Sequence, residues 1–177
     1  MDLKGSKIIL TGGSSGLGKQ TAKDLILKGA ELIITGRDKD KLTKVALELG
    51  CVAFHADVSI EEEAKATVDF ARERWGRLDV LINNAGYAEW GLIAELDINK
   101  MKEVYNTNVF GATAMAKYAA KLFKSQKSGN IINIASTAAS KGFPQGSIYA
   151  SSKFALTGLT QCWQAELRPF NVRVIQI

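Results

Sequence analysis

Short β-branched runs alternate with longer amphipathic segments along the chain, and this alternation constrains the fold more than any other feature. The strand-like runs cover residues 7–11, 31–35, 52–56, 80–83, 130–135 and 172–177. Helical periodicity covers 18–27, 39–49, 61–75, 97–124 and 147–167, the fourth being long enough for two consecutive helices. Strands joined through helices pair in parallel by right-handed crossovers. The sequence therefore predicts a doubly wound α/β fold, a six-stranded parallel sheet with helices on both faces.

Size and charge exclude several classes of protein. A chain of 177 residues, 46% apolar and 23% charged, suits one soluble globular domain over residues 1–177. No apolar run approaches the roughly 18 residues that span a bilayer, and the first residues lack the apolar core of a signal peptide. The net charge of +5 comes from cations interleaved with acids, without a basic block. We therefore expect a cytoplasmic protein that binds neither membrane nor nucleic acid.

The cysteines and the single histidine do not form a metal-ligand pattern. Cys51 begins a strand-like run, Cys162 falls in a helical one, and His55 is isolated from both. Zinc sites need clustered ligands, and a Ser-His-Asp triad needs a suitably placed histidine. We predict no metal site and no triad, and we expect both cysteines to be small buried residues. Ser59 is expected to cap the helix over 61–75.

A glycine-rich segment lies between the first strand and the first helix. Glycines there let backbone amides approach a pyrophosphate at the helix amino terminus, where the helix dipole favours negative charge. The spacing is G-x-x-x-G-x-G without a following Gly-Lys-Ser/Thr, which disfavours a P-loop. A flexible Gly-Ser connection is the alternative. The residues predicted to cradle the nucleotide are Gly12, Ser14, Ser15, Gly16, Leu17 and Gly18.

Arg37 follows Gly36 at the end of the second strand. At this position a carboxylate binds a free ribose 2′-hydroxyl, whereas an arginine accommodates a 2′-phosphate. Asp38 is expected to cap the next helix and not to bind the ribose. Arg37 therefore favours NADP over NAD, although the same side chain could simply be hydrated in a loop.

Tyr149 and Lys153 lie one helical turn apart, and Ser136 follows the fifth strand-like run. A phenol transfers protons poorly at neutral pH unless a permanent cation lies nearby. At positions i and i+4 the two side chains share one helix face, so Lys153 is placed to be that cation. Tyr-x-x-x-Lys also arises by chance in many helices, so the pair gains meaning only from the rest of the chain.

Taken together, these segments resemble the short-chain dehydrogenase/reductase family, in the compact subgroup that includes the 3-oxoacyl-carrier-protein reductases. The resemblance rests on the glycine loop at 11–18, Asp57-Val58, Asn83-Asn84-Ala85-Gly86, Asn108, Ser136 and the Tyr149/Lys153 pair, in family order. It implies that Asp57 and Val58 border an adenine. It also implies that the cofactor channel is lined by Asn84, Ala85 and Gly86.

The resemblance further implies a four-residue catalytic centre. Tyr149 would exchange a proton with the substrate oxygen while hydride moves to or from the nicotinamide. Lys153 would lower the pKa of the phenol and hold the nicotinamide ribose, and Ser136 would hydrogen-bond the developing alkoxide. Asn108 would help to hold a water chain that leads from Lys153. Without the family, Asn108 would pass for a break between two helices.

The chain also departs from the family pattern. Family members usually continue beyond the sixth strand with a nicotinamide loop, a substrate-covering segment and a seventh strand, so we expect a piece of a longer or shortened protein with an exposed sheet edge. We expect weak cofactor binding and low turnover by these 177 residues. The helices over 97–124 and 147–167 resemble the pair that builds family homodimers and homotetramers.

Several readings of function remain open on sequence alone. The leading one is an NADP-dependent oxidoreductase that acts on a carbonyl or secondary alcohol, with a 3-oxoacyl compound as one candidate. A non-catalytic nucleotide-binding module is the second. A sugar-nucleotide epimerase or dehydratase is the third, disfavoured by the glycine spacing. Segments 87–96 and 137–148 should overhang the site, where Trp90 and Phe143 could contact an apolar substrate or merely anchor the loops.

Overall fold

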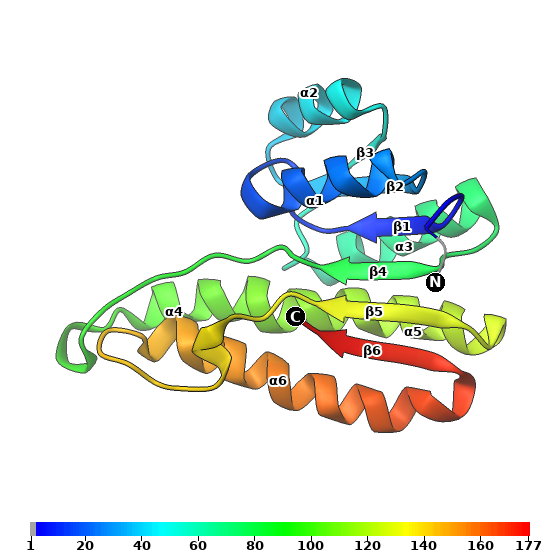
Figure 1. Ribbon diagram of the computed structural model, residues 1–177. Helices are drawn as coiled ribbons and strands as arrows, with labels where there is room; N and C mark the ends of the chain where they lie inside the picture. Colours follow the sequence, from blue (N-terminus) through cyan, green and yellow to red (C-terminus); the bar gives the residue numbers. More distant parts are fainter. Residues whose placement is uncertain (1–2) are drawn as a thin grey trace.

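In the computed structural model, which describes residues 3–177, six parallel strands form a single sheet (Figure 1). Their order is β3-β2-β1-β4-β5-β6, so the chain winds outward from β1 in both directions. The predicted doubly wound fold is confirmed. The strands are β1 (Lys7–Leu10), β2 (Glu31–Gly36), β3 (Val52–His55), β4 (Val80–Asn83), β5 (Gly129–Asn133) and β6 (Val172–Gln176).

Helices cover both faces of this sheet (Figure 1). One face packs against α1 (Gly16–Leu27) and α2 (Lys39–Leu49). The other packs against α3 (Glu61–Trp75), α5 (Ala112–Gln126) and α6 (Ser147–Leu167). The segment predicted to hold two helices contains α4 (Ile98–Tyr105) and α5, with the π-helical turn η2 (Asn106–Gly111) between them. Short 3₁₀ turns complete the chain: η1 (Ile93–Glu95), η3 (Thr137–Ala139) and η4 (Arg168–Phe170).

The central strands are apolar throughout because both of their faces are buried. In β1, Ile8 and Leu10 pack on the α1/α2 side, whereas Ile9 packs on the α3/α5 side. Successive strand residues point to opposite faces, so an unbroken apolar run supplies both cores. Each fully buried side chain of this size contributes about 1.5–3 kcal/mol relative to an exposed one.

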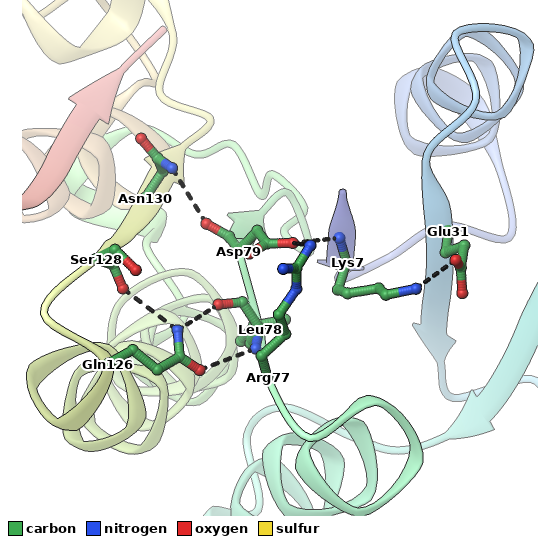
Figure 2. A network of polar contacts seen from close by, with 8 residues as sticks. All are labelled: Lys7, Glu31, Arg77, Leu78, Asp79, Gln126, Ser128 and Asn130. Atoms are coloured by element: carbon green, nitrogen blue, oxygen red, sulfur yellow. Dashed lines mark hydrogen bonds and ion pairs between the residues drawn. The ribbon is translucent and has the colours of Figure 1, made fainter. Parts of the chain in front are cut away.

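A network of polar contacts closes the amino-terminal end of the sheet (Figure 2). The Asp79 carboxylate accepts a hydrogen bond of 2.8 Å from the Lys7 backbone N–H and pairs with Arg77 at 3.3 Å. The side-chain amide of Gln126, at the end of α5, accepts from the Leu78 N–H at 3.1 Å and donates to the Leu78 carbonyl at 2.8 Å. The Lys7 side chain pairs with Glu31, on the neighbouring strand. The starts of β1, β2 and β4 are thereby fixed to one another and to α5.

The predicted cap of α3 was wrong. The residue before α3 is Ile60, and Ser59 does not cap that helix. Instead the Ser59 N–H and hydroxyl both donate to the Asp57 carboxylate, at 2.9 and 2.7 Å. The Glu63 carboxylate in turn accepts from the Asp57 N–H at 2.6 Å. An Asx turn at Asp57 has therefore taken the hydroxyl that the cap would have used.

The cysteines were only partly predicted. Cys162 is exposed, because its position on α6 points away from the sheet, so the prediction that it is buried was wrong. Cys51 is half-buried, and this burial raises the pKa of its thiol to about 11. Among residues 3–177, no group of three or more histidine, cysteine and acidic side chains is arranged to bind a metal ion. None of the helices in this range has the length and apolarity needed to cross a bilayer.

Candidate functional site

An open cleft of about 580 Å³ lies at the carboxyl ends of the central strands. Binding sites of doubly wound sheets form at this end, where the crossovers on the two sides diverge. Every residue that the sequence predicted for cofactor binding lines the cleft. They are Gly12, Ser14, Ser15, Gly16, Leu17, Gly18, Arg37, Asp57, Val58, Asn84, Ala85, Gly86, Tyr149 and Lys153.

The glycine loop is held close to the end of β4. Gly12 has a φ of +68°, and a Cβ on Gly18 would lie 2.2 Å from the Gly12 carbonyl oxygen, so both positions require glycine. The Asn84 side chain donates to the Thr11 carbonyl at 2.8 Å. The Thr11 hydroxyl accepts from the backbone N–H groups of Asn84 and Ala85 at 3.0 and 2.9 Å. The first turn and the β4 turn therefore form one rigid wall.

The amino terminus of α1 opens into this cleft. Ser15 occupies the N-cap position but makes no capping hydrogen bond, and the first turn contains no acidic residue. The first N–H groups of a helix have no intrahelical acceptor, and the helix dipole places partial positive charge there. With the glycine loop beside it, this end of α1 is suited to a phosphate group.

A basic corner flanks the cleft beyond β2. The Arg37 side chain is 64% exposed, with a guanidinium nitrogen 4.0 Å from an Asp57 carboxylate oxygen and the guanidinium carbon 5.8 Å from the centre of the Tyr87 ring. A Cβ on Gly36 would lie 3.1 Å from the Ser14 hydroxyl, so glycine keeps the corner open. Asp38 accepts from the Lys41 N–H at 3.0 Å and caps α2, as predicted.

Lys153 is buried at the deep end of the cleft. It is 6% exposed, and its Nζ donates to the Ile134 carbonyl at 2.8 Å. Burial lowers the pKa of this ammonium from 10.5 to about 8, because the charged form loses hydration. Within residues 3–177 it forms no ion pair. Its Nζ lies 5.7 Å from the centre of the Tyr149 ring, so the predicted pairing along α6 is present in the fold.

Asn108 lies behind the cleft wall instead of lining the cleft. It is fully buried within η2, accepts from the Tyr87 N–H at 3.1 Å and donates to the Tyr87 carbonyl at 3.0 Å. It also donates to the Ser152 hydroxyl at 3.1 Å. A Cβ on Gly86 would lie 2.9 Å from the Asn108 side-chain oxygen. Asn108 thus ties the loop after β4 to α6.

Ser136 borders a second cavity, of about 560 Å³, which it shares with Tyr149. Its hydroxyl accepts from the Ala138 N–H at 3.1 Å and caps η3. Tyr149 lines both cavities, so this residue lies between the cleft and the second space. Ser136 and Lys153 therefore border Tyr149 from different cavities.

Some residues of the site escaped the sequence reasoning. Thr11 joins two turns, Ser152 joins α6 to η2, and the Ile134 carbonyl holds Lys153. Thr11 is the first residue of the glycine loop at 11–18, but the sequence does not indicate its bonds to the turn after β4. Ser152 lies between Tyr149 and Lys153 in the sequence, but its partner is 44 residues away, so no local pattern indicates the contact.

Comparison with known proteins agrees with this geometry. Residues 6–177 match the family model for short chain dehydrogenase. The chain is 33% identical to zerumbone synthase of Zingiber zerumbet and 34% identical to short chain aldehyde dehydrogenase 1 of Euphorbia lathyris. These matches cover 98% and 97% of this chain but 67% and 62% of the relatives, so the chain spans about two thirds of their length.

Solved structures give the same result. The crystal structure of NAD⁺-bound xylitol dehydrogenase is 30% identical and superposes with a TM-score of 0.93, over 99% of this chain and 70% of that one. A short-chain type dehydrogenase/reductase from Mycobacterium ulcerans, also 30% identical, gives a TM-score of 0.96 over 99% of this chain and 67% of its own. The chain therefore belongs to the short-chain dehydrogenase family of nicotinamide-dependent oxidoreductases.

Proposed function

We propose that residues 1–177 form a single NADP-binding unit of an oxidoreductase that interconverts a carbonyl compound and a secondary alcohol, with Tyr149 as the acid/base. The observation that carries this proposal is the place of Tyr149 at the meeting of two cavities, with a buried ammonium beside it. One cavity has the phosphate-binding features of a nucleotide site. The other has room for a small substrate.

The residues of the cleft fit a nicotinamide dinucleotide. A Cβ on Gly12 would lie 2.9 Å from the Ala85 Cα, and one on Gly18 would lie 2.2 Å from the Gly12 carbonyl oxygen, so glycine at both positions holds the loop against the end of β4. The buried Thr35 hydroxyl, which borders the cleft, has no hydrogen-bond partner among the described residues. The glycine loop and the uncapped amino terminus of α1 therefore form a phosphate cradle, and Lys153 lines the same cleft.

The proposed acid/base chemistry uses the hydroxyls of Tyr149 and Ser136. A bound nicotinamide supplies or accepts the hydride. Tyr149 donates its hydroxyl proton to the substrate carbonyl oxygen in reduction and accepts it back in oxidation. The Ser136 oxygen already accepts from the Ala138 N–H, which leaves the hydroxyl proton free to stabilise charge on the substrate oxygen.

Lys153 supplies the positive charge. An ammonium has three donors, and one of them is bonded to the Ile134 carbonyl. Two donors remain for ribose hydroxyls and for the phenol side of the site. Asn108 holds the loop after β4 through Tyr87, and we propose that it also orders water near Lys153.

Arg37 supports NADP as the cofactor. Its exposed guanidinium stands at the rim of the cleft, and Lys41 lines the same corner. Two cations beside the ribose position favour a 2′-phosphate over a free hydroxyl. Thermal-shift titration should therefore give greater stabilisation by NADPH than by NADH, because only binding to the folded state raises stability. Greater stabilisation by NADH would overturn the assignment.

We also propose that the chain associates with a second copy through the outward side of α6 and the adjoining turn η2. Phe110 and Phe154 are both exposed there, and Cys162 follows on α6. Exposed aromatic side chains on adjoining elements favour a homodimer, with a homotetramer as the larger alternative. A strictly monomeric mass by light scattering at micromolar concentration would contradict association.

The decisive experiment is the Tyr149→Phe substitution, followed by the NADPH absorbance in the presence of carbonyl compounds, 3-oxoacyl thioesters among them. Loss of the hydroxyl should reduce kcat by about 10²- to 10⁴-fold. The affinity for NADPH should change little. Unaltered turnover would show that Tyr149 is not the acid/base, whereas no hydride transfer by either protein would favour the non-catalytic module.

A further inference from the structure

The cavity next to Ser136 is bordered by a continuous aromatic surface, which we call the aromatic wall and which consists of Trp90, Phe143 and Tyr149. The Trp90 ring centre lies 5.3 Å from that of Tyr149 and 5.8 Å from that of Phe143, at interplanar angles of 58° and 44°. The wall thus begins at the proposed acid/base and extends away from it. All three residues line the cavity of about 560 Å³.

The aromatic wall is fixed before any ligand arrives. The Gly91 N–H donates to the Gln145 carbonyl at 3.1 Å, which joins the loop that contains Trp90 to the loop that contains Phe143. The Gly146 N–H donates to the Phe143 carbonyl at 3.0 Å. A Cβ on Gly146 would lie 2.7 Å from the Phe143 ring, so this ring packs directly on the backbone. Rings that are held in place lose little freedom when they bind a ligand.

Trp90 and Phe143 are not buried loop anchors. They are 53% and 42% exposed, although both are large apolar side chains. Covering apolar surface stabilises a complex by about 25 cal/mol for each Å² removed from water. A rigid exposed aromatic surface beside a catalytic phenol is therefore a surface on which a ligand gains binding energy.

The remaining groups of the cavity narrow the chemistry of that ligand. No acidic side chain lines the cavity among the described residues, and Lys141 at its exposed loop is the one charged residue there. The Ser140 hydroxyl donates to the Thr137 carbonyl at 2.9 Å, and the Ser136 oxygen accepts from Ala138. The polar groups that remain for a ligand are the hydroxyls of Ser136, Thr137 and Tyr149 and the Lys141 ammonium. A cavity of this volume lies within the range of about 300–1,000 Å³ that holds small organic ligands.

We infer that the substrate carries a planar or cyclic apolar group that packs on Trp90 and Phe143 while its carbonyl reaches Tyr149 and Ser136. This inference rests on the proposed function, since it requires Tyr149 to be the acid/base. It makes Trp90 and Phe143 specificity-determining residues. The geometry favours a ketone with a fused aromatic ring over a linear chain, because aromatic pairs gain energy from ring contact beyond that of buried area.

The test compares 1-tetralone, a bicyclic ketone, with 2-decanone, a linear ketone of the same carbon number. Binding of each is measured by equilibrium dialysis at saturating NADP⁺, an oxidised cofactor that cannot reduce the ketone. Trp90→Ala should weaken 1-tetralone binding about ten-fold and 2-decanone binding less than about three-fold. Phe143→Ala should show the same preference with a smaller loss. Trp90→Leu, which keeps apolar bulk without a ring, should behave like Trp90→Ala and guards against a folding defect.

Leu47→Ala removes another exposed apolar side chain, one that does not line the cavity, and should leave both affinities unchanged. Tighter binding of 2-decanone by the unmodified chain, or equal losses for both ketones in Trp90→Ala, would overturn the inference. Either result, with NADP⁺ still raising the melting temperature, would leave the proposed function intact. Failure of NADP⁺ to bind and of Tyr149→Phe to change turnover would instead contradict the proposed function.

Discussion

The two ends of the sheet differ. At the amino-terminal end, side chains form hydrogen bonds or ion pairs at the starts of the strands, whereas at the carboxyl end the turns border open cavities. The Asp79 side chain satisfies a backbone group of β1, and the Gln126 side chain satisfies two backbone groups just before β4 (Figure 2). At the other end, Lys153 is buried without a counter-ion and the Thr35 hydroxyl has no partner among the described residues. The first end stabilises the fold, and the second retains the remaining donors of Lys153 and the uncapped amino terminus of α1 for a ligand. Substitutions at the two ends should therefore separate stability from binding.

The largest effect is expected for Gly18→Ala, at the carboxyl end. The new methyl group would lie 2.2 Å from the Gly12 carbonyl oxygen and 2.6 Å from the Asn84 amide nitrogen, so the glycine loop must move. We expect NADPH to bind about 100-fold more weakly. The corresponding loss of binding free energy is of the size that a single disruptive substitution produces. Fluorescence titration with NADPH measures this. Gly142→Ala, which meets open space, is the matched control.

Gln126→Ala tests the amino-terminal end. It would leave the N–H and carbonyl of the fully buried Leu78 without their side-chain partner. Each unsatisfied buried group costs about 1–3 kcal/mol, so the free energy of unfolding should fall by about 2–4 kcal/mol. Urea denaturation gives this value, and NADPH affinity should not change. A loss of NADPH affinity as large as that of Gly18→Ala would contradict the division between the two ends.

The parts of this comparison differ in how far sequence reveals them. The glycine loop, the Arg37 corner and the Tyr149/Lys153 spacing are local patterns, and the cleft brings all of them together. The contacts of Gln126 with Leu78 and of Asn108 with Ser152 join residues 48 and 44 positions apart. Such contacts depend on how helices pack on the sheet, and that packing has no local signature.

The wrong predictions have the same physical origin. Ser59 could cap α3, but the nearer Asp57 carboxylate takes its N–H and hydroxyl. Cysteine is a residue type that is often buried, yet the position of Cys162 on α6 faces outward. In both cases residue type alone left two environments open, and the packing of neighbouring elements selected one of them.

Lys153→Met should raise stability while removing the proposed catalytic cation. Burial lowers the pKa of Lys153 from 10.5 to about 8, so between these values the unfolded chain binds more protons than the folded one. Stability therefore rises with pH across this window, and below about pH 8 the buried charge costs the folded state free energy. We expect Lys153→Met to be about 1–3 kcal/mol more stable at pH 7, with the advantage shrinking toward pH 10.5.

Urea denaturation at several pH values measures this difference, and Lys23→Met, at an exposed position on α1, is the control. Equal stability of Lys153→Met and the unmodified chain at pH 7 would mean that the hydrogen bond to the Ile134 carbonyl compensates fully for the lost hydration. The buried Lys153 charge at the carboxyl end would then cost the folded state less free energy than the contrast between the two ends of the sheet implies.

The smallest effect is expected for Gly158→Ala, in the middle of α6. Alanine favours a helix interior over glycine by up to about 1 kcal/mol, and a Cβ at this position meets no atom within 4 Å. Stability should therefore rise by about 0.5–1 kcal/mol, with turnover and NADPH affinity unchanged.

Gly158 shares its helix face with Phe154 and Cys162, four residues to either side, on the surface proposed to bind a second copy. Close contact of two backbones at Gly158 would reverse the result, because the methyl group would then weaken association. Light scattering together with urea denaturation separates a stabilised α6 from a disrupted dimer, and so decides whether glycine here serves the interface or only weakens the helix.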